Sequence, residues 1–160
     1  MAAQLMSALM QLSLLAGSSQ VSYSEAYAAS QQTGKPMLVL IGADWCPHCV
    51  TMKNQVIPQV ERDGSLQQVS YVPLNSDRHP ALAQQMMQGN SVPQLVLYYR
   101  TAEGWQRRRI TGGTSAANVS SLIQQAVKAV AANPPASPPT IPVSDPSANS
   151  ASTQQGMLRK

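Results

Sequence analysis

The residues Trp45-Cys46-Pro47-His48-Cys49 contain both cysteines of this 160-residue chain, separated by two residues. An apolar run, 37–41, precedes them, and a segment with helical spacing of apolar residues, 50–60, follows them. A strand, a C-x-x-C turn and a helix form the arrangement in which two thiols can close a reversible disulfide at a helix N-terminus. We therefore predict a redox site here.

The residue types between strand and helix suit thiol–disulfide exchange, in which the nucleophile is a thiolate. Cys46 would lie at the helix start, where unpaired N–H groups and the helix dipole favour a negative charge. Pro47 suits the first helical position because it has no N–H to leave unpaired, and His48 adds a nearby donor that can be cationic. We expect Cys49, one turn later, to face inward as the second thiol, and Trp45 to wall the site.

Three other uses of a C-x-x-C pair fit less well. A c-type haem site needs a histidine directly after the second cysteine, where this chain has Val50. A closed zinc site needs four ligands, and the chain offers only the two cysteines, His48 and His79. A static disulfide over so short a ring would stabilise the fold little. We therefore predict a redox-active pair that needs no metal or other cofactor.

Length and composition predict one domain with a real core, because 43% of the residues are apolar. The net charge of +4 is small and scattered, so we expect no nucleic-acid partner, and we expect a monomer. Arg107-Arg108-Arg109 is the only basic run. Its members would alternate between the two faces of a strand, and we interpret them as a solvated edge or surface.

The two ends of the chain differ from the middle. Residues 1–20 begin with an apolar segment that resembles the core of a secretory signal peptide, although the usual lysine or arginine near the start is missing. A soluble amphipathic helix is the alternative. We predict a periplasmic or secreted protein with transient membrane association during export, the alternative being a cytoplasmic one. Half of the 12 prolines lie in residues 133–160, which we predict to be a disordered tail.

Between these ends, apolar periodicity and turn residues predict alternating helices and strands. We expect helices over 21–32, 50–60 (kinked or ended at Pro58), 81–88 and 115–132. We expect strands over 37–41, 69–74, 94–99 and 105–110.

This order of elements, with Ala43-Asp44-Trp45-Cys46-Pro47-His48-Cys49 and a later Val92-Pro93, resembles the thioredoxin-like family over residues 21–132. The resemblance implies an α/β, three-layer fold with a central mixed sheet of about four strands flanked by helices. It also implies that Cys46 is the attacking thiol, Cys49 the resolving thiol and Pro93 a cis-proline beside them. The Val92-Pro93 edge would then hold the substrate backbone as an added strand.

Two departures from the family pattern bear on the direction of electron flow. Cytosolic thioredoxins carry Gly-Pro between the cysteines, whereas Pro47-His48 resembles the periplasmic thiol oxidases. Leu40 stands where thioredoxins have a buried aspartate, and Pro73 stands where they have its lysine partner. Both departures predict a couple that is more oxidising than a cytosolic thioredoxin's.

The leading hypothesis is a thiol–disulfide oxidoreductase that acts on protein cysteines and is recycled by a redox partner. The alternative is a binding module of the same fold, either a chaperone or a carrier of copper or zinc. Such a carrier would use Cys46, Cys49 and His48, since soft thiolates suit Cu(I).

Overall fold

The computed structural model describes residues 22–136. Four strands form one mixed sheet in the order β2-β1-β3-β4. β1 pairs in parallel with β2, while β3 is antiparallel to both β1 and β4. The strands are β1 (Met37–Gly42), β2 (Ser70–Asn75), β3 (Gln94–Thr101) and β4 (Gly104–Thr111).

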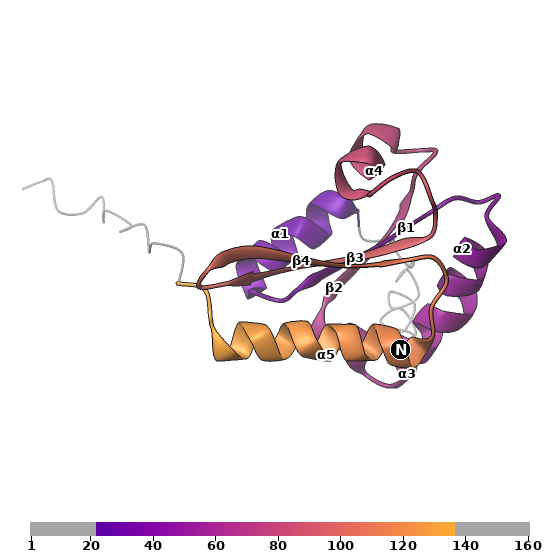
Figure 1. The fold of residues 1–160 in the computed structure, drawn as a ribbon. Helices are drawn as coiled ribbons and strands as arrows, with labels where there is room; N and C mark the ends of the chain where they lie inside the picture. Colours follow the sequence, from indigo (N-terminus) through magenta and orange to yellow (C-terminus); the bar gives the residue numbers. More distant parts are fainter. Residues whose placement is uncertain (1–21, 137–160) are drawn as a thin grey trace, which may run out of the picture.

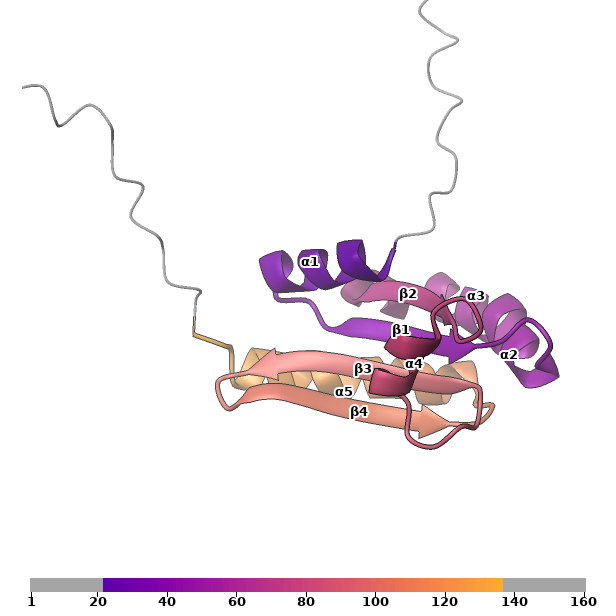
Figure 2. The same ribbon diagram turned by 90° about the horizontal axis from the view of Figure 1, so that it is seen from above.

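Helices cover both faces of the sheet, which gives three layers (Figure 1). Figure 2 shows the four strands lying side by side, in the order β2, β1, β3 and β4 from top to bottom. One face packs against α1 (Tyr23–Thr33) and α4 (Pro80–Met86). The other packs against α5 (Ala116–Ala132) and the helical run after the cysteines. The predicted α/β, thioredoxin-like three-layer fold is thus confirmed.

The central strand β1 is apolar at positions 37–41 because both of its faces are buried. Leu38 and Leu40 belong to the core beneath α5, whereas Met37, Val39 and Ile41 belong to the core beneath α1 and α4. A strand that is covered on both faces has no solvent side and needs no polar alternation. β1 therefore forms a rigid base that carries the cysteine turn at its C-terminal end.

The sequence predicts that the helix after the cysteines is kinked or ended at Pro58. The helical run does not end there. It continues as α2 (Pro47–Thr51), a π-helical turn η1 (Met52–Val56) and α3 (Ile57–Arg62). The Ile57 N–H donates to the Met52 carbonyl across the widened turn. Because proline has no N–H, a wide turn directly before it lets the helix pass with little loss of backbone bonding.

Two other helix boundaries differ from prediction because of side-chain hydrogen bonds. Ser22 caps α1: its hydroxyl accepts from the Glu25 N–H, and the Glu25 carboxylate accepts from the Ser22 N–H. The helix therefore begins at Tyr23 rather than residue 21. α4 stops at Met86, short of the predicted residue 88, because the backbone of Gln88 bonds instead to the side chain of Gln94.

The predicted signal segment 1–20 lies outside the described residues, as does most of the predicted tail. At the point where the tail would begin, the Ala102 N–H donates to the Asn133 carbonyl at 3.0 Å and fastens the end of α5 to the β3–β4 hairpin. Within residues 22–136, no helix is both long enough and apolar enough to cross a bilayer.

Candidate redox site

Cys46 and Cys49 are joined by a disulfide, with their Cα atoms 5.2 Å apart. Cys46 is the N-cap of α2, and its Sγ lies 3.2 Å from the Cys49 N–H, which points at it. Pro47 occupies the first turn of the helix, as its lack of an N–H favours. The sulfur of Cys46 therefore lies within reach of a helix-start N–H donor, which the Cys46 carbonyl shares at 3.0 Å. Such a donor stabilises a thiolate after reduction.

The Val92–Pro93 peptide bond is cis, as the family resemblance implies, and it faces the disulfide from the β3 side. The Val92 carbonyl oxygen lies 3.7 Å from Cys46 Sγ, and Val92 packs against the small cluster of Ala43, Cys46 and Cys49. The Gly112 N–H donates to the Pro93 carbonyl at 2.8 Å, which ties this loop to the end of β4. The structure thus brings Val92 and Pro93 together with the cysteines.

Trp45 lies at the rim of the site, with 71% of its surface exposed. Its indole Nε1 donates to Asp77 at 2.9 Å, and Arg78 of the same loop pairs with Asp44 at 3.1 Å. These contacts fasten the loop after β2 to the turn that carries the cysteines. The exposed indole face is therefore held in a defined position beside the disulfide rather than enclosing it.

The His48 side chain lies beside the turn after β4. A methyl group placed on Gly113 would lie 3.8 Å from His48 Nδ1, so the imidazole packs beside this glycine. The side chain is exposed. Its influence on Cys46 would therefore act through space and not through a direct hydrogen bond in this oxidised state.

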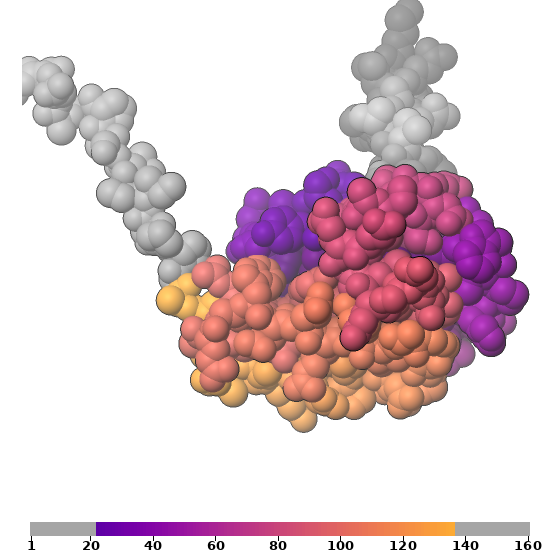
Figure 3. Space-filling view, turned by 45° about the horizontal axis from the view of Figure 1, so that its top comes forward, coloured from indigo at the N-terminus to yellow at the C-terminus, as the bar shows by residue number. Residues whose placement is uncertain are grey.

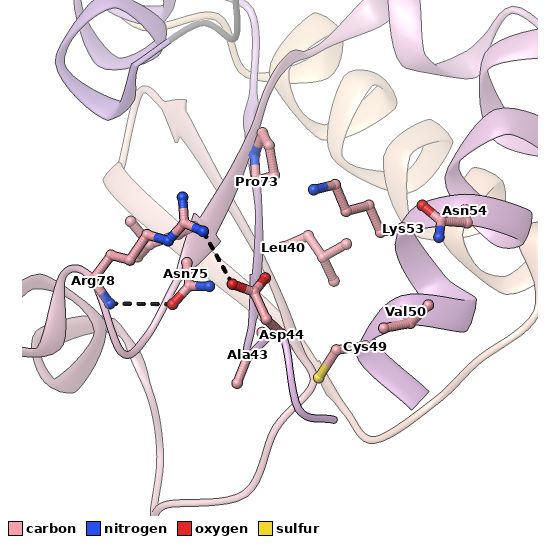
Figure 4. A pocket seen from close by; sticks show the side chains of 12 residues that line it. Leu40, Ala43, Asp44, Cys49, Val50, Lys53, Asn54, Pro73, Asn75 and Arg78 are labelled. Atoms are coloured by element: carbon pink, nitrogen blue, oxygen red, sulfur yellow. Dashed lines mark hydrogen bonds and ion pairs between the residues drawn. The ribbon is translucent and has the colours of Figure 1, made fainter. Parts of the chain in front are cut away.

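Cys49 faces inward onto a cavity of about 300 Å³ (Figure 4). The floor of the cavity is apolar, because Leu40 and Pro73 are register partners in β1 and β2 and both line it. Lys53 and the Asp44–Arg78 ion pair also line the cavity. The two positions at which the sequence predicts a departure from thioredoxins thus lie side by side, and both line the same cavity as Cys49.

Close packing of strand and helix beside Cys49 requires a glycine. A Cβ atom built on Gly42 would lie 3.0 Å from Cys49 Cβ and 3.2 Å from its Sγ. Such contacts are shorter than van der Waals separation, so any larger residue would displace the cysteine. The last residue of β1 is therefore part of the site, although its sequence position alone did not reveal it.

Sequence reasoning missed four side chains that organise the site. The sequence predicts only a loop around Asp77 and Arg78, and it predicts ordinary strand residues at Gln94 and Arg109. For Arg109 the prediction of a solvated edge is wrong: it is half-buried and bonds to the end of α4. No periodic pattern in the sequence reveals these four, since each bonds to at least one residue that is 6 to 34 positions away.

The carrier alternative needs further metal ligands near the cysteine pair. Within residues 22–136, no group of three or more histidine, cysteine or acidic side chains is close enough together to hold an ion. His79 lies at the start of α4 and His48 beside Gly113.

A family model described as thioredoxin-like matches residues 19–99, just over half of the chain. The chain belongs to the thioredoxin-like family. A thioredoxin-like protein of Synechocystis sp. is 39% identical over 93 residues, which cover 57% of this chain and 78% of the relative. Within this family, the cysteine pair at the helix start is the expected place for redox chemistry.

Solved structures give the same result for this thioredoxin-like protein. Chloroplastic thioredoxin z superposes with a TM-score of 0.56 at 21% identity, over 68% of this chain and 92% of the other, which speaks for the fold alone. A DsbH oxidoreductase superposes with a TM-score of 0.52 at 26% identity, over 67% and 82%. Fold, cysteine pair and relatives together support a thiol–disulfide oxidoreductase, as the sequence predicted.

Proposed function

We propose that this thioredoxin-like protein oxidises pairs of cysteines in other proteins by passing its Cys46–Cys49 disulfide to them. The observation that carries the proposal is the position of Cys46. Its sulfur caps a helix and lies beside the backbone edge of Val92. That edge has the geometry to pair with an extended substrate chain, which would bring a substrate sulfur to Cys46.

The exchange proceeds in two balanced steps. A substrate thiolate attacks Cys46 Sγ, the bond to Cys49 breaks, and Cys49 leaves with the electron pair and takes up a proton. A second substrate thiolate then attacks the substrate sulfur of the mixed disulfide, and Cys46 leaves as a thiolate. The substrate loses two electrons and the protein gains them, so a separate oxidant of the disulfide class must recycle the protein.

Two features favour oxidation over reduction. A thiolate exists only in the reduced protein, so the helix start at Cys46 stabilises the reduced form and makes the disulfide a stronger oxidant. The apolar pair Leu40–Pro73 beneath Cys49 leaves no ionisable group at those two positions to assist reduction. An oxidant of this kind fits a periplasmic or secreted protein, where disulfides persist.

The rate of peptide oxidation by a Cys46→Ser variant distinguishes this proposal from a chaperone function. Wild-type oxidised protein should form disulfides in a reduced two-cysteine peptide, and Cys46→Ser should form none. A chaperone activity, measured as suppressed aggregation of an unfolding client, would survive the same change. If Cys46→Ser retained the peptide oxidation rate, the redox proposal would be wrong.

His48→Gly is expected to make the reduction potential of the Cys46–Cys49 couple more negative and to raise the pKa of the Cys46 thiol. A donor that can be cationic favours a nearby thiolate, and for this couple about 30 mV corresponds to roughly 1.4 kcal/mol. Equilibration with glutathione measures the potential, and alkylation rate against pH measures the pKa.

His79→Gly is the matched control, because His79 is also exposed and lies at the start of another helix. It should leave both quantities unchanged. If the His48→Gly potential stayed within error of wild type, His48 would be only a surface residue beside Gly113.

A further inference from the structure

The first residue of β3, Gln94, is fully buried, with none of its surface exposed. Its side-chain amide makes three hydrogen bonds. Nε2 donates to the carbonyls of Gln88 and Ser91 at 3.0 and 2.8 Å, and Oε1 accepts from the Gln88 N–H at 3.0 Å. Both N–H donors and the carbonyl of this amide are thus satisfied within the loop 87–93.

The middle of the loop that Gln94 binds, residues 88–91, has little packing of its own. Residues 88–91 are all exposed, and Gly89 has a positive φ of 68°. An exposed segment without buried apolar side chains orders only through its hydrogen bonds. The buried amide of Gln94 replaces the backbone partners that a strand or helix would have supplied.

Arg109 holds the same loop from the edge strand β4. One guanidinium nitrogen donates to the side-chain oxygen of Gln88 at 2.6 Å, and the other donates to the Met86 carbonyl at 2.6 Å. The Met86 carbonyl belongs to the last turn of α4, where a cation is favoured by the helix dipole. In the space-filling view, the segment around α4 lies directly against the β3–β4 hairpin (Figure 3).

The loop held in this way ends at the cis-proline. Val92, whose carbonyl lies 3.7 Å from Cys46 Sγ, follows directly after Ser91, whose carbonyl Gln94 binds. A shift of the loop would therefore move the Val92 backbone relative to the disulfide. Since misplacement by about 1 Å can cost a reaction up to roughly 100-fold, the fixing of this loop matters for exchange with a bound chain.

We propose that Gln94 and Arg109 are positioning residues, which together hold the loop 87–93 so that the Val92 edge presents a substrate chain to Cys46. They touch neither sulfur and act only through the loop. The proposal rests on the proposed function, because it assigns to these residues the recognition of an extended polypeptide at the same site. Small thiols, which need no backbone pairing, should not depend on them.

The test compares two substrates of the oxidised protein: a reduced two-cysteine peptide and dithiothreitol. Arg109→Gln and Gln94→Leu should each lower the peptide rate about fivefold or more while changing the dithiothreitol rate less than about twofold. Arg109→Lys, which keeps a cationic donor, should recover part of the peptide rate. Arg107→Gln is the matched control, because it makes the same change at an exposed position of the same strand.

A purely structural role predicts lower melting temperatures with an unchanged ratio of peptide to dithiothreitol rates, and that result would overturn the proposal. If Gln94→Leu fails to fold, Arg109→Gln carries the test alone. The rate of hydrogen exchange at the backbone N–H of Gln88, which donates to Gln94, reports the stability of the loop without any need for turnover. If wild type oxidises neither substrate, the proposed function fails, yet faster exchange in Arg109→Gln than in Arg107→Gln still supports the positioning role, and equal exchange refutes it.

Discussion

A Cys49→Ser variant is expected to accumulate a covalent complex with disulfide-containing protein substrates, whereas Cys46→Ser is expected to form none. The sulfur of Cys46 lies beside the backbone N–H of residue 49 at the helix start and beside the Val92 carbonyl. It can attack a substrate disulfide without Cys49. The mixed disulfide then persists, because the thiol that would break it is absent, and its decay should slow by more than about 100-fold.

The two cysteines differ little in exposure, at 5% and 6%, so access alone does not assign the nucleophile. The positions of the two cysteines in the helix assign the nucleophile instead. Cys46 caps the helix, while Cys49 lies inside its first turn against Gly42. Non-reducing electrophoresis with a disulfide-containing substrate would reveal the complex, which dithiothreitol should release. A complex that forms with Cys46→Ser instead would mean that Cys49 is the attacking thiol.

Leu40→Asp is expected to destabilise the protein by roughly 3–5 kcal/mol, a large part of the 5–15 kcal/mol that holds a typical domain together. Leu40 is 4% exposed and lies between Pro73 on one strand and Leu95 on the other. A carboxylate there would lose hydration and gain no cationic partner from Pro73, and we expect Lys53, which lines the same cavity, to offset only part of that loss. Chemical denaturation at two pH values measures the effect.

The pH dependence of this variant follows from the sign of its pKa shift. Burial raises the pKa of the introduced carboxyl above its unfolded value of about 3.9. Below that pH the carboxyl is neutral in both the folded and the unfolded state, so its charge lowers the free energy of unfolding least there. The loss of stability should grow as pH rises from about 4 toward 7. Leu40→Asn is the matched control, since it has the same shape without the charge, and should show no such trend. Identical trends in the two variants would contradict a buried carboxylate with a raised pKa.

Local sequence was enough to predict most of the fold. The run 37–41 is apolar at every position because β1 is buried on both faces, and that burial leaves a signal in consecutive residues. The cysteine turn, the final helix and the hairpin likewise leave short-range patterns. The sequence also placed Leu40 and Pro73 at corresponding positions, and they are register partners in the sheet.

Side chains that act at a distance could not be predicted in this way. Arg109 looked like one member of a solvated basic run, yet its guanidinium reaches the carbonyl of Met86, 23 residues earlier. Gln94 looked like a polar start to a strand, yet it is one of the most buried residues. Polar residues at strand positions carry no periodic signal, so their partners appear only when the chain has folded.

The hydrogen bond between Ala102 and Asn133 has a practical consequence for immobilising the protein. The helix α5 begins just after Gly113, beside His48, and ends at this bond, so it separates the two ends of the molecule by about 25 Å at 1.5 Å per residue. A linker to a bead or an electrode that is attached after residue 133 would leave the disulfide facing outward. Oriented coupling at that point should therefore preserve access for large substrates, whereas coupling through Lys53, which lines the cavity beside Cys49, should block it.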